Sequence, residues 1–370
     1  MNILFAAGGT AGHINPAIAI ADYFRDNLKD ANICFAGTPK GMESTLVPKA
    51  GYDFVSMRVR GFQRKPSLKN FFRNVDALYL LALSRFRAKS IIRKFKPDMV
   101  IGTGGYVSGP ILLAANKMGI KTAIHEQNAY PGVTNKILAK RADLVFLAVE
   151  EAKKRMPECR AVVVGNPVRK NILNKNKSQA RKILKMDDNF CILSFGGSLG
   201  AVKVNEIAAD LIAWHSSFGK INHIHAMGRL GRGCFPKMLE ERGVNLKKNP
   251  RIDVRDYIHN MDICLAAADL VVCRAGALTL AELEAAAKPS ILIPSPNVAE
   301  NHQYYNAVVL QNRKAAVVVE EKSYDKNFLI QTVKSFYEDK NKLREYSKNA
   351  AKIAILDTPK RVFEHVMNLF

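Results

Sequence analysis

Short apolar runs rich in β-branched and aromatic residues alternate with longer segments of helical periodicity along the whole chain. In the first half these runs predict strands at 3–7, 33–36, 99–102, 122–125, 144–148 and 162–164. In the second half they predict strands at 191–195, 221–226, 251–254, 270–272, 291–293 and 316–319. Strands that alternate with helices form βαβ units, in which the strands run parallel. The pattern therefore predicts an α/β protein built on parallel sheets.

One pattern of strand, turn and helix occurs twice. ILFAAGGTAGHINPAIAIAD (3–22) begins the first half and ILSFGGSLGAVKVNEIAADL (192–211) begins the second. Each is typical of the start of a Rossmann-like domain, so we expect two such domains whose parallel sheets face each other across a cleft. Pro167 interrupts the pattern and indicates a hinge. We therefore expect domains at 1–165 and 166–342 and a helical segment at 343–370, whose return to the first domain is left open.

Composition narrows the choice of partners. The chain carries 56 Lys and Arg against 33 Asp and Glu, a net charge of +23, which favours nucleic acid, anionic lipid or a phosphorylated substrate. The six cysteines lack the spacing of a zinc site or a redox pair, so we expect free thiols, a reducing compartment and no metal. No apolar stretch approaches the roughly 18 residues of a spanning helix, and no signal peptide precedes the first strand. We therefore expect a cytoplasmic protein.

Glycine-rich turns follow several of the predicted strands, at 8–13, 102–109 and 196–200. Glycines let backbone N–H groups approach an anion closely, and the N-terminus of the following helix adds a favourable dipole. A tight strand-to-helix turn explains any one loop equally well, but two equivalent loops favour a phosphorylated ligand. The loops at 8–13 and 196–200 match neither the Walker pattern nor a dinucleotide fingerprint, which weakens the ATPase and dehydrogenase interpretations.

Polar residues follow two further strands. HEQN (125–128) ends the strand predicted at 122–125, where it suits hydroxyl recognition, proton transfer or loop stabilisation. In VCRAGALTLAE (272–282), Arg274 and the N–H groups of the helix start are placed to meet a phosphate. Glu282 fits two roles, binding a ribose diol or capping the helix with Thr279, and the T-x-x-E spacing alone favours capping.

The chain resembles the MurG family of glycosyltransferases in a series of motifs between residues 8 and 307. They are GGTAGHINPA, GGYVSGP, HEQN, GNPVR, FGGSLGA, CRAGALTLAE and ENHQYYNA, in the family's order and spacing. The resemblance implies a GT-B fold and metal-independent, inverting transfer of N-acetylglucosamine without a cofactor. The donor would be UDP-N-acetylglucosamine, and the acceptor the 4-hydroxyl of the muramyl sugar of lipid I, an undecaprenyl-pyrophosphoryl-muramyl-pentapeptide. The product would be lipid II for peptidoglycan, made by a peripheral enzyme at the cytoplasmic face of the cell membrane.

The resemblance also implies roles for individual residues. Arg169 and Ser198 would approach the donor diphosphate, with Thr10, Ala11 and Gly12 closing over it. The donor would also meet Ala277, Leu278, Thr279, Leu280, Ala281 and Glu282, with Glu282 on the ribose, Ile258 on the uracil, and Gln303 and Asn128 on the sugar. The acceptor would meet His13, Gly104, Tyr106 and Glu126. Two departures from the family pattern, Ala11 for glycine and His302 for glutamine, leave the assignment intact.

Transfer of the sugar develops positive charge on its anomeric carbon and negative charge on the departing phosphate. No D-x-D metal motif follows a predicted strand, so backbone N–H groups, a helix dipole and Arg169 or Arg274 are expected to stabilise the leaving group. The attacking hydroxyl needs a base. His13 is the first choice, because an imidazole titrates near neutrality, and Glu126 is the second. A purely orienting role for His13 stays open.

The segment 60–96 combines eleven basic residues and one acid with Phe62, Phe71, Phe72, Tyr79 and Phe86. We interpret it as a surface for an anionic membrane, with apolar side chains in the lipid and basic ones at the headgroups, rather than as a solvated helix pair. It lacks an RNA-binding motif and paired stacking platforms, which argues against nucleic acid. A UDP-sugar epimerase that does not use NAD and a glycolipid synthase are the alternative functions.

Overall fold

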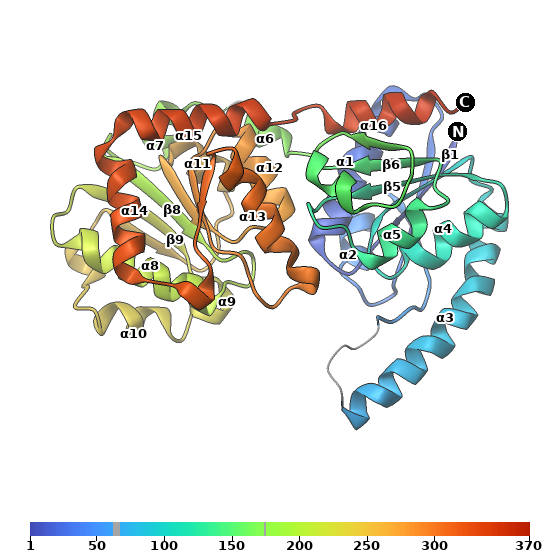
Figure 1. The fold of residues 1–370 in the computed structure, drawn as a ribbon, viewed down its shortest axis with the longest axis horizontal. Helices are drawn as coiled ribbons and strands as arrows, with labels where there is room; N and C mark the ends of the chain where they lie inside the picture. Colours follow the sequence, from blue (N-terminus) through green and yellow to red (C-terminus); the bar gives the residue numbers. More distant parts are fainter. Residues whose placement is uncertain (62–66, 174) are drawn as a thin grey trace. The chain divides into compact units, whose positions relative to one another are not determined.

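The structure is a computed structural model that describes residues 1–61, 67–173 and 175–370 (Figure 1). It divides into two compact units, one formed by Met1–Pro167 and Leu356–Phe370, the other by Val168–Ile355. The segment expected as one helical stretch at 343–370 is shared between them. The first part of this segment belongs to α15 (Lys340–Ile353) in the second unit. The last part forms α16 (Thr358–Met367) in the first unit.

The first unit contains, within the described residues, a parallel sheet of seven strands in the order β3-β2-β1-β4-β5-β6-β7. The strands are β1 (Asn2–Ala7), β2 (Asn32–Gly37), β3 (Asp53–Ser56), β4 (Met99–Gly104), β5 (Lys121–Glu126), β6 (Leu144–Leu147) and β7 (Ala161–Val163). Besides α16, the helices are α1 (Ala11–Asn27), α2 (Glu43–Lys49), α3 (Leu68–Phe95), α4 (Ser108–Lys117), α5 (Val133–Ala139) and the 3-10 turn η1 (Glu150–Arg155). The strand order reverses at β1, which pairs with both β2 and β4.

The second unit repeats this topology, with a parallel sheet of six strands among its described residues, in the order β10-β9-β8-β11-β12-β13. The strands are β8 (Phe190–Phe195), β9 (Ile221–Ala226), β10 (Ile252–Arg255), β11 (Leu270–Cys273), β12 (Ser290–Leu292) and β13 (Ala316–Val318). The helices before β11 are α6 (Lys170–Leu173), α7 (Lys177–Ile183), α8 (Val202–Ser216), α9 (Gly228–Gly231), α10 (Phe235–Glu240), η2 (Leu246–Lys248) and α11 (Met261–Ala267). After β11 come α12 (Ala277–Ala285), η3 (Ala299–Asn301), α13 (His302–Asn312), η4 (Glu321–Ser323), α14 (Lys326–Glu338) and α15.

The predicted α/β class and parallel sheets are confirmed, and each predicted strand is present within two residues of its expected ends. β3 is an additional strand. Its sequence DFVS holds only two apolar side chains, and both are half-exposed at the edge of the sheet. A run this short carries too little hydrophobic signal to be distinguished from a loop.

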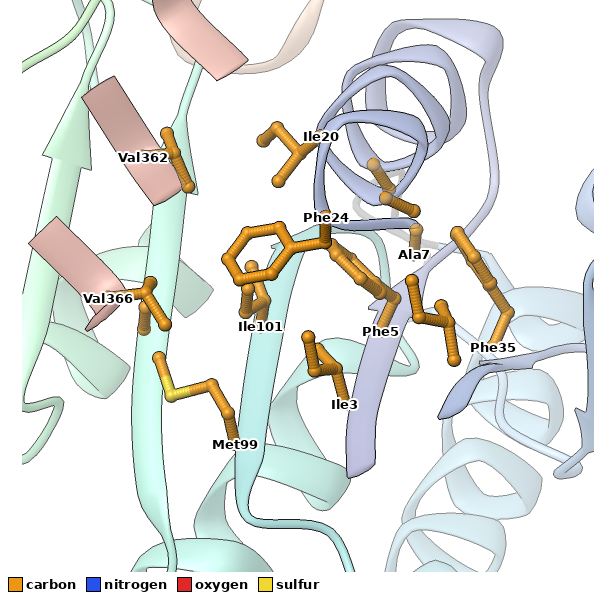
Figure 2. Packing of buried hydrophobic residues seen from close by; sticks show 14 of the residues in the cluster. Ile3, Phe5, Ala7, Ile20, Phe24, Phe35, Met99, Ile101, Val362 and Val366 are labelled. Carbon is orange, nitrogen blue, oxygen red and sulfur yellow. The ribbon is translucent and has the colours of Figure 1, made fainter. Parts of the chain in front are cut away.

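Helix α16 completes the core of the first unit. Val362 and Val366 are fully buried beside Ile20 and Phe24 of α1, in the same apolar cluster as the inner side chains of β1 and β4 (Figure 2). The hydroxyl of Thr358, at the start of α16, donates a 2.7 Å hydrogen bond to the carbonyl of Val164. The end of the chain therefore folds with the first unit because its apolar face covers α1 and the sheet.

Candidate functional site

Both sheets place glycine-rich turns where the strand order reverses. In the first unit these turns follow β1 and β4, and in the second they follow β8 and β11. Open parallel sheets bind ligands at the carboxyl ends of their strands, beside this switch point. Most of the candidate residues named from the sequence lie in or beside these turns, at the carboxyl ends of the strands of their own sheet.

The two turns of the first unit contact each other through glycine backbone. The N–H of Gly8 donates a 3.3 Å hydrogen bond to the carbonyl of Gly104. Gly105 packs so closely on Gly8 that any side chain at 105 would overlap the Gly8 backbone. Gly104 and Gly105 have φ angles of 120° and 86°, which favour glycine. These glycines are therefore required by the packing of the turns themselves, apart from any ligand.

His13 lies in the first turn of α1, between these two glycine turns. Its Nδ1 is 3.1 Å from the carbonyl oxygen of Gly8, which can only accept, so Nδ1 carries the proton. The neutral ring then has its lone pair on Nε2. The ring edge bearing Cδ2 and Nε2 lies against Gly104, where an added Cβ would come within 2.6 Å of Cδ2. Gly104 therefore leaves the space that the imidazole occupies.

Glu126, at the end of β5, is 2% exposed and holds the following loop together. Its Oε1 accepts hydrogen bonds from the backbone N–H and side-chain amide of Asn128, at 2.9 and 3.1 Å. Its Oε2 accepts from the N–H of Gly132 at 3.0 Å and from the side chain of Asn135 at 2.8 Å. Asn135, a buried residue of α5, was not predicted from the sequence. Glu126 therefore orders the loop that presents Asn128.

The first and third residues of HEQN, His125 and Gln127, form hydrogen bonds within the protein. The ring of His125 is buried, with Nε2 2.9 Å from the carbonyl of Gly165 and Nδ1 3.0 Å from the amide nitrogen of Gln127. Gln127 also donates to the carbonyl of Thr103 at the end of β4. Burial lowers the pKa of His125, so the ring is neutral at pH 7.

The rest of the expected first-unit site lies at the surface. Thr10 is an exposed N-cap residue in extended conformation, and Ala11 is the first residue of α1. Ala11 has no positive φ, so alanine replaces the family's glycine without backbone strain. Gly12 follows in the same helical turn, and Tyr106 is 59% exposed and packs against Gly61.

In the second unit, Arg169 and Glu282 form a bidentate ion pair. Nε of Arg169 lies 2.6 Å from Oε1 of Glu282, and the terminal nitrogen NH2 lies 3.0 Å from Oε2. The hydrogen bonds that Arg169 donates to Glu282 raise the pKa of its guanidinium above the usual value. The resemblance implied that these side chains bind different parts of one ligand, and the structure places them in direct contact.

The capping role suggested for Glu282 with Thr279 is wrong. Helix α12 begins at Ala277 with Gly276 as its N-cap residue, so Thr279 already lies in the first turn and cannot be the cap. Glu282 comes one turn later and is half-buried beside Arg169. Leu280 and Ala281 are buried in the unit, while Leu278 is half-buried. The N-terminus of α12 is therefore not capped by a side chain of its own first turn.

The guanidinium of Arg274 is engaged by groups of its own unit. One terminal nitrogen donates to the carbonyl of Ile293 at 3.1 Å, and the other lies 2.5 Å from a carboxylate oxygen of Glu321. Its charge is therefore neutralised within the unit. Arg169, whose side chain is 52% exposed, is the better placed of the two arginines to meet a leaving phosphate.

The remaining residues expected to bind the donor lie after the ends of β8, β10 and β12. Ser198 is exposed in the turn after β8, whose Gly200 packs tightly on the carbonyl of Met227. Ile258 is buried in the turn after β10. Gln303 accepts a 2.9 Å hydrogen bond on Oε1 from the N–H of Ser295, which directs its amide NH₂ toward other acceptors.

A buried histidine network that the sequence analysis missed lies beneath the turn after β8. Its hydrogen bonds connect in order His215, His223, Ser194, His225, Asn205 and the carbonyl of Met227, at 2.9, 2.8, 2.7, 3.2 and 3.0 Å. Burial lowers the pKa of His215 to about 4 and that of His225 to about 3, so both rings are neutral at pH 7. In the sequence, the feature that points to this network is the alternation of histidine with apolar residues in INHIHA. The structure shows that this strand is buried on both faces.

Helix α3 presents an apolar stripe to solvent. Its members recur every three or four residues and are 46–74% exposed: Phe72, Val75, Tyr79, Leu83 and Phe86. The opposite face, with Ala88, Ile91 and Ile92, is buried in the unit. Arg85, Arg87, Lys89, Arg93 and Lys94 are exposed on the same helix. Phe62, named from the sequence, lies outside the described residues, as does the position of the Phe71 side chain. Along the described part of the chain, no helix is both long and apolar enough to cross a bilayer.

Comparison with known proteins places this geometry in a family. Residues 3–147 match the glycosyltransferase family 28 N-terminal domain, and residues 191–362 match its C-terminal domain. The chain is 42% identical to a UDP-N-acetylglucosamine–N-acetylmuramyl-(pentapeptide) pyrophosphoryl-undecaprenol N-acetylglucosamine transferase from Acetivibrio thermocellus, over 100% of this chain and 98% of that protein. The chain belongs to the MurG family of glycosyltransferases.

Solved structures agree with this family membership. MurG from Acinetobacter baumannii superimposes with a TM-score of 0.79 at 26% identity, over 99% of both chains, which confirms the GT-B fold. A UDP-N-acetylglucosamine 2-epimerase from Neisseria meningitidis, bound to UDP-N-acetylglucosamine, matches with a TM-score of 0.68 at 13% identity over 100% of both chains. At that identity the epimerase shares the fold alone. The MurG family membership distinguishes this chain from the epimerase class that shares its architecture.

Proposed function

We propose that this protein transfers N-acetylglucosamine from UDP-N-acetylglucosamine to the 4-hydroxyl of the muramyl sugar of lipid I, which yields lipid II for peptidoglycan synthesis. The observation that carries the proposal is the full-length match, at 42% identity, to a relative with that transferase name. Two further features support it: His13 lies at the switch point of the first unit, and Arg169 and Glu282 pair in the second.

The second unit supplies the groups suited to the donor. The N-terminus of α12 favours an anion through its dipole and its first-turn N–H groups, which fits a diphosphate. Arg169 can turn from Glu282 to a phosphate, because its guanidinium reaches solvent. Glu282 then accepts hydrogen bonds from the ribose diol, and the amide NH₂ of Gln303 donates to a sugar oxygen.

The first unit supplies the base. In the proposed reaction the bond from C1 of the sugar to the UDP phosphate breaks, and a bond to the acceptor oxygen forms on the opposite face. Nε2 of His13 takes the hydroxyl proton, while the dipole of α12 and Arg169 stabilise the charge on departing UDP. Glu126 is less suited to proton transfer, because both of its oxygens already accept hydrogen bonds.

The direct test is the reaction itself. We expect the purified protein to convert lipid I and radiolabelled UDP-N-acetylglucosamine into lipid II and UDP, with label in the lipid fraction. Label that stays in the nucleotide sugar, with its N-acetyl sugar epimerised, would support the epimerase alternative. Transfer to another glycolipid but not to lipid I would support a glycolipid synthase.

We further propose that the enzyme works as a peripheral protein on the cytoplasmic membrane face, where the polyprenyl tail holds the acceptor. The apolar stripe of α3 suits insertion among lipid chains, and the exposed arginines and lysines on the helix suit anionic headgroups. Each basic residue near an anionic surface contributes about 1 kcal/mol, an attraction that salt screens.

Reversing charge on this helix should remove the protein from vesicles. We expect a variant with Arg87, Lys89, Arg93 and Lys94 changed to Glu to lose binding to anionic vesicles, and to lose turnover on lipid I embedded in them. The reason is that about 4 kcal/mol of attraction becomes repulsion. Sedimentation with vesicles of graded anionic lipid content, at two salt concentrations, measures the effect.

A matched control makes the same charge change elsewhere. Lys340, Arg344, Lys348 and Lys352 are exposed along α15 in the second unit, and their change to Glu should leave vesicle binding close to normal. Turnover on a short-chain, soluble acceptor should survive in both variants. Equal loss of binding in both would mean that net charge alone attracts the protein, and undiminished binding of the α3 variant would place the docking surface elsewhere.

A further inference from the structure

A buried carboxylate that the proposed mechanism does not use lies beneath the first glycine turn. Glu43 is the first residue of α2 and is 0% exposed. Its side chain reaches under the turn that follows β1, where glycines at 8, 37 and 41 make room for it. An added Cβ at Gly8 would lie 2.6 Å from Oε1, and side chains at Gly37 and Gly41 would also overlap the Glu43 side chain.

The carboxylate is held in its charged form. Oε1 accepts hydrogen bonds from the backbone N–H and the hydroxyl of Thr38, at 2.8 and 2.6 Å, and Oε2 accepts from the N–H of Gly9 at 3.1 Å. Burial raises the pKa of Glu43, but these hydrogen bonds outweigh it, so the pKa lies below its usual value. A negative charge therefore lies directly under the glycine turn at pH 7.

The N–H of Gly9 and the carbonyl of Gly8 belong to the same peptide group. Glu43 binds the N–H end of that group, and Nδ1 of His13 donates to its carbonyl end at 3.1 Å. Hydrogen bonds in series polarise one another, so a charged acceptor at the N–H makes the carbonyl a stronger acceptor. The carboxylate of Glu43, the peptide group and the imidazole of His13 are thus connected by one continuous series of hydrogen bonds.

We infer that Glu43 is a positioning residue that acts through the peptide between Gly8 and Gly9 to hold His13 with its proton on Nδ1. The lone pair is then on Nε2, which lies beside Gly104, and it can accept the proton of the acceptor hydroxyl. Glu43 itself touches neither substrate. The inference rests on the proposed function, in which His13 is the base.

The same contact distinguishes the two glycine turns. The Gly9 N–H is already bound to a carboxylate, which disfavours a phosphate at that donor. The turn after β8 is supported instead by neutral residues, the histidine network that ends at Met227. The first turn is therefore built to orient an imidazole, although the two turns look alike in sequence.

Glu43→Gln tests the inference, because an amide NH₂ facing the Gly9 N–H cannot accept its hydrogen bond. We expect turnover to fall about ten- to a hundredfold, the effect of losing one charge-assisted hydrogen bond, with the Michaelis constant for the donor little changed. We also expect a measurable share of neutral His13 to move its proton to Nε2. The nitrogen chemical shifts of the ring, assigned by comparison with His13→Ala, report that tautomer without any need for turnover.

Thr38→Val is the matched control. It removes a hydrogen bond from the other oxygen of Glu43 and leaves the Gly9 contact in place, so the His13 tautomer and turnover should stay close to normal. If Glu43→Gln does not fold, Glu43→Asp, which withdraws the carboxylate from Gly9, takes its place in the same measurements.

An unchanged tautomer in a folded Glu43 variant would overturn the inference, whatever the turnover. A shifted tautomer with undiminished turnover would also overturn it as a catalytic device, and would show that His13 is not the base. Absence of lipid II from the parent enzyme would refute the proposed function separately, because the tautomer measurement needs no substrate. A shifted tautomer together with reduced turnover supports the chain from Glu43 to His13.

Discussion

Replacing His13 by alanine is expected to lower turnover by about a hundredfold or more, while the affinity for UDP stays close to that of the parent. The expectation follows from the ring geometry. Nδ1 is engaged by the Gly8 carbonyl, so the proton-accepting nitrogen is Nε2, and nothing else in the turn replaces it as a base. Turnover on lipid I and calorimetric titration with UDP measure the two effects separately.

Glu126→Gln is the informative comparison for that result. The amide cannot accept hydrogen bonds at both ends, so we expect a lower melting temperature and a looser loop around Asn128. Turnover abolished in a stably folded Glu126→Gln, beside near-normal turnover in His13→Ala, would move the base role to Glu126. Loss of UDP binding in His13→Ala would instead make His13 a structural part of the turn.

Glu282→Ala is expected to raise the Michaelis constant for the donor more than tenfold. A charge-assisted hydrogen bond to the ribose diol is worth about 1.5–3 kcal/mol, and its loss affects binding of the nucleotide rather than the chemical step. The effect on stability should be small, because the partner Arg169 is half-exposed and such pairs contribute about 1 kcal/mol or less. Turnover measured at graded donor concentrations gives the Michaelis constant, and thermal melting gives the change in stability.

Two variants calibrate this prediction. Glu338→Ala removes the carboxylate of an exposed ion pair with Lys334 on α14, and it should leave the Michaelis constant for the donor unchanged. Arg169→Ala should also weaken donor binding, through the diphosphate rather than the ribose, and so weaken binding of UDP more than that of uridine. A normal donor constant in Glu282→Ala would show that this carboxylate serves only its pair with Arg169.

The sequence indicates much of the candidate site because the features that mark it are local. Gly104, His13 and Ser198 stand in glycine-rich turns directly after apolar strands, and such turns are visible in a few consecutive letters. The local rule failed for Glu282, where T-x-x-E suggested a capping box. The helix begins at Ala277, two residues before the threonine, because the backbone after β11 turns at Gly276.

The partners of these residues were not predictable. Arg169 pairs with Glu282, which lies 113 residues away in the sequence. Glu126 accepts a hydrogen bond from Asn135 because the loop between them folds back. Glu43 stands in an ordinary helix start, EST, and gains its role only because α2 brings it beneath Gly9. Such contacts depend on where the elements pack, which no short stretch of sequence encodes.

The sequence by itself determined the alternation of strands and helices, the parallel sheets and the turns at the strand ends, because apolar periodicity and glycine act over a few neighbouring residues. Only the tertiary structure decided that 356–370 returns to the first unit, where Val362 and Val366 cover α1. It also decided that one glycine turn rests on the charged Glu43 and the other on neutral histidines. The physical reason is that burial and hydrogen-bond partners set a side chain's charge and direction, and both arise only when distant segments pack together.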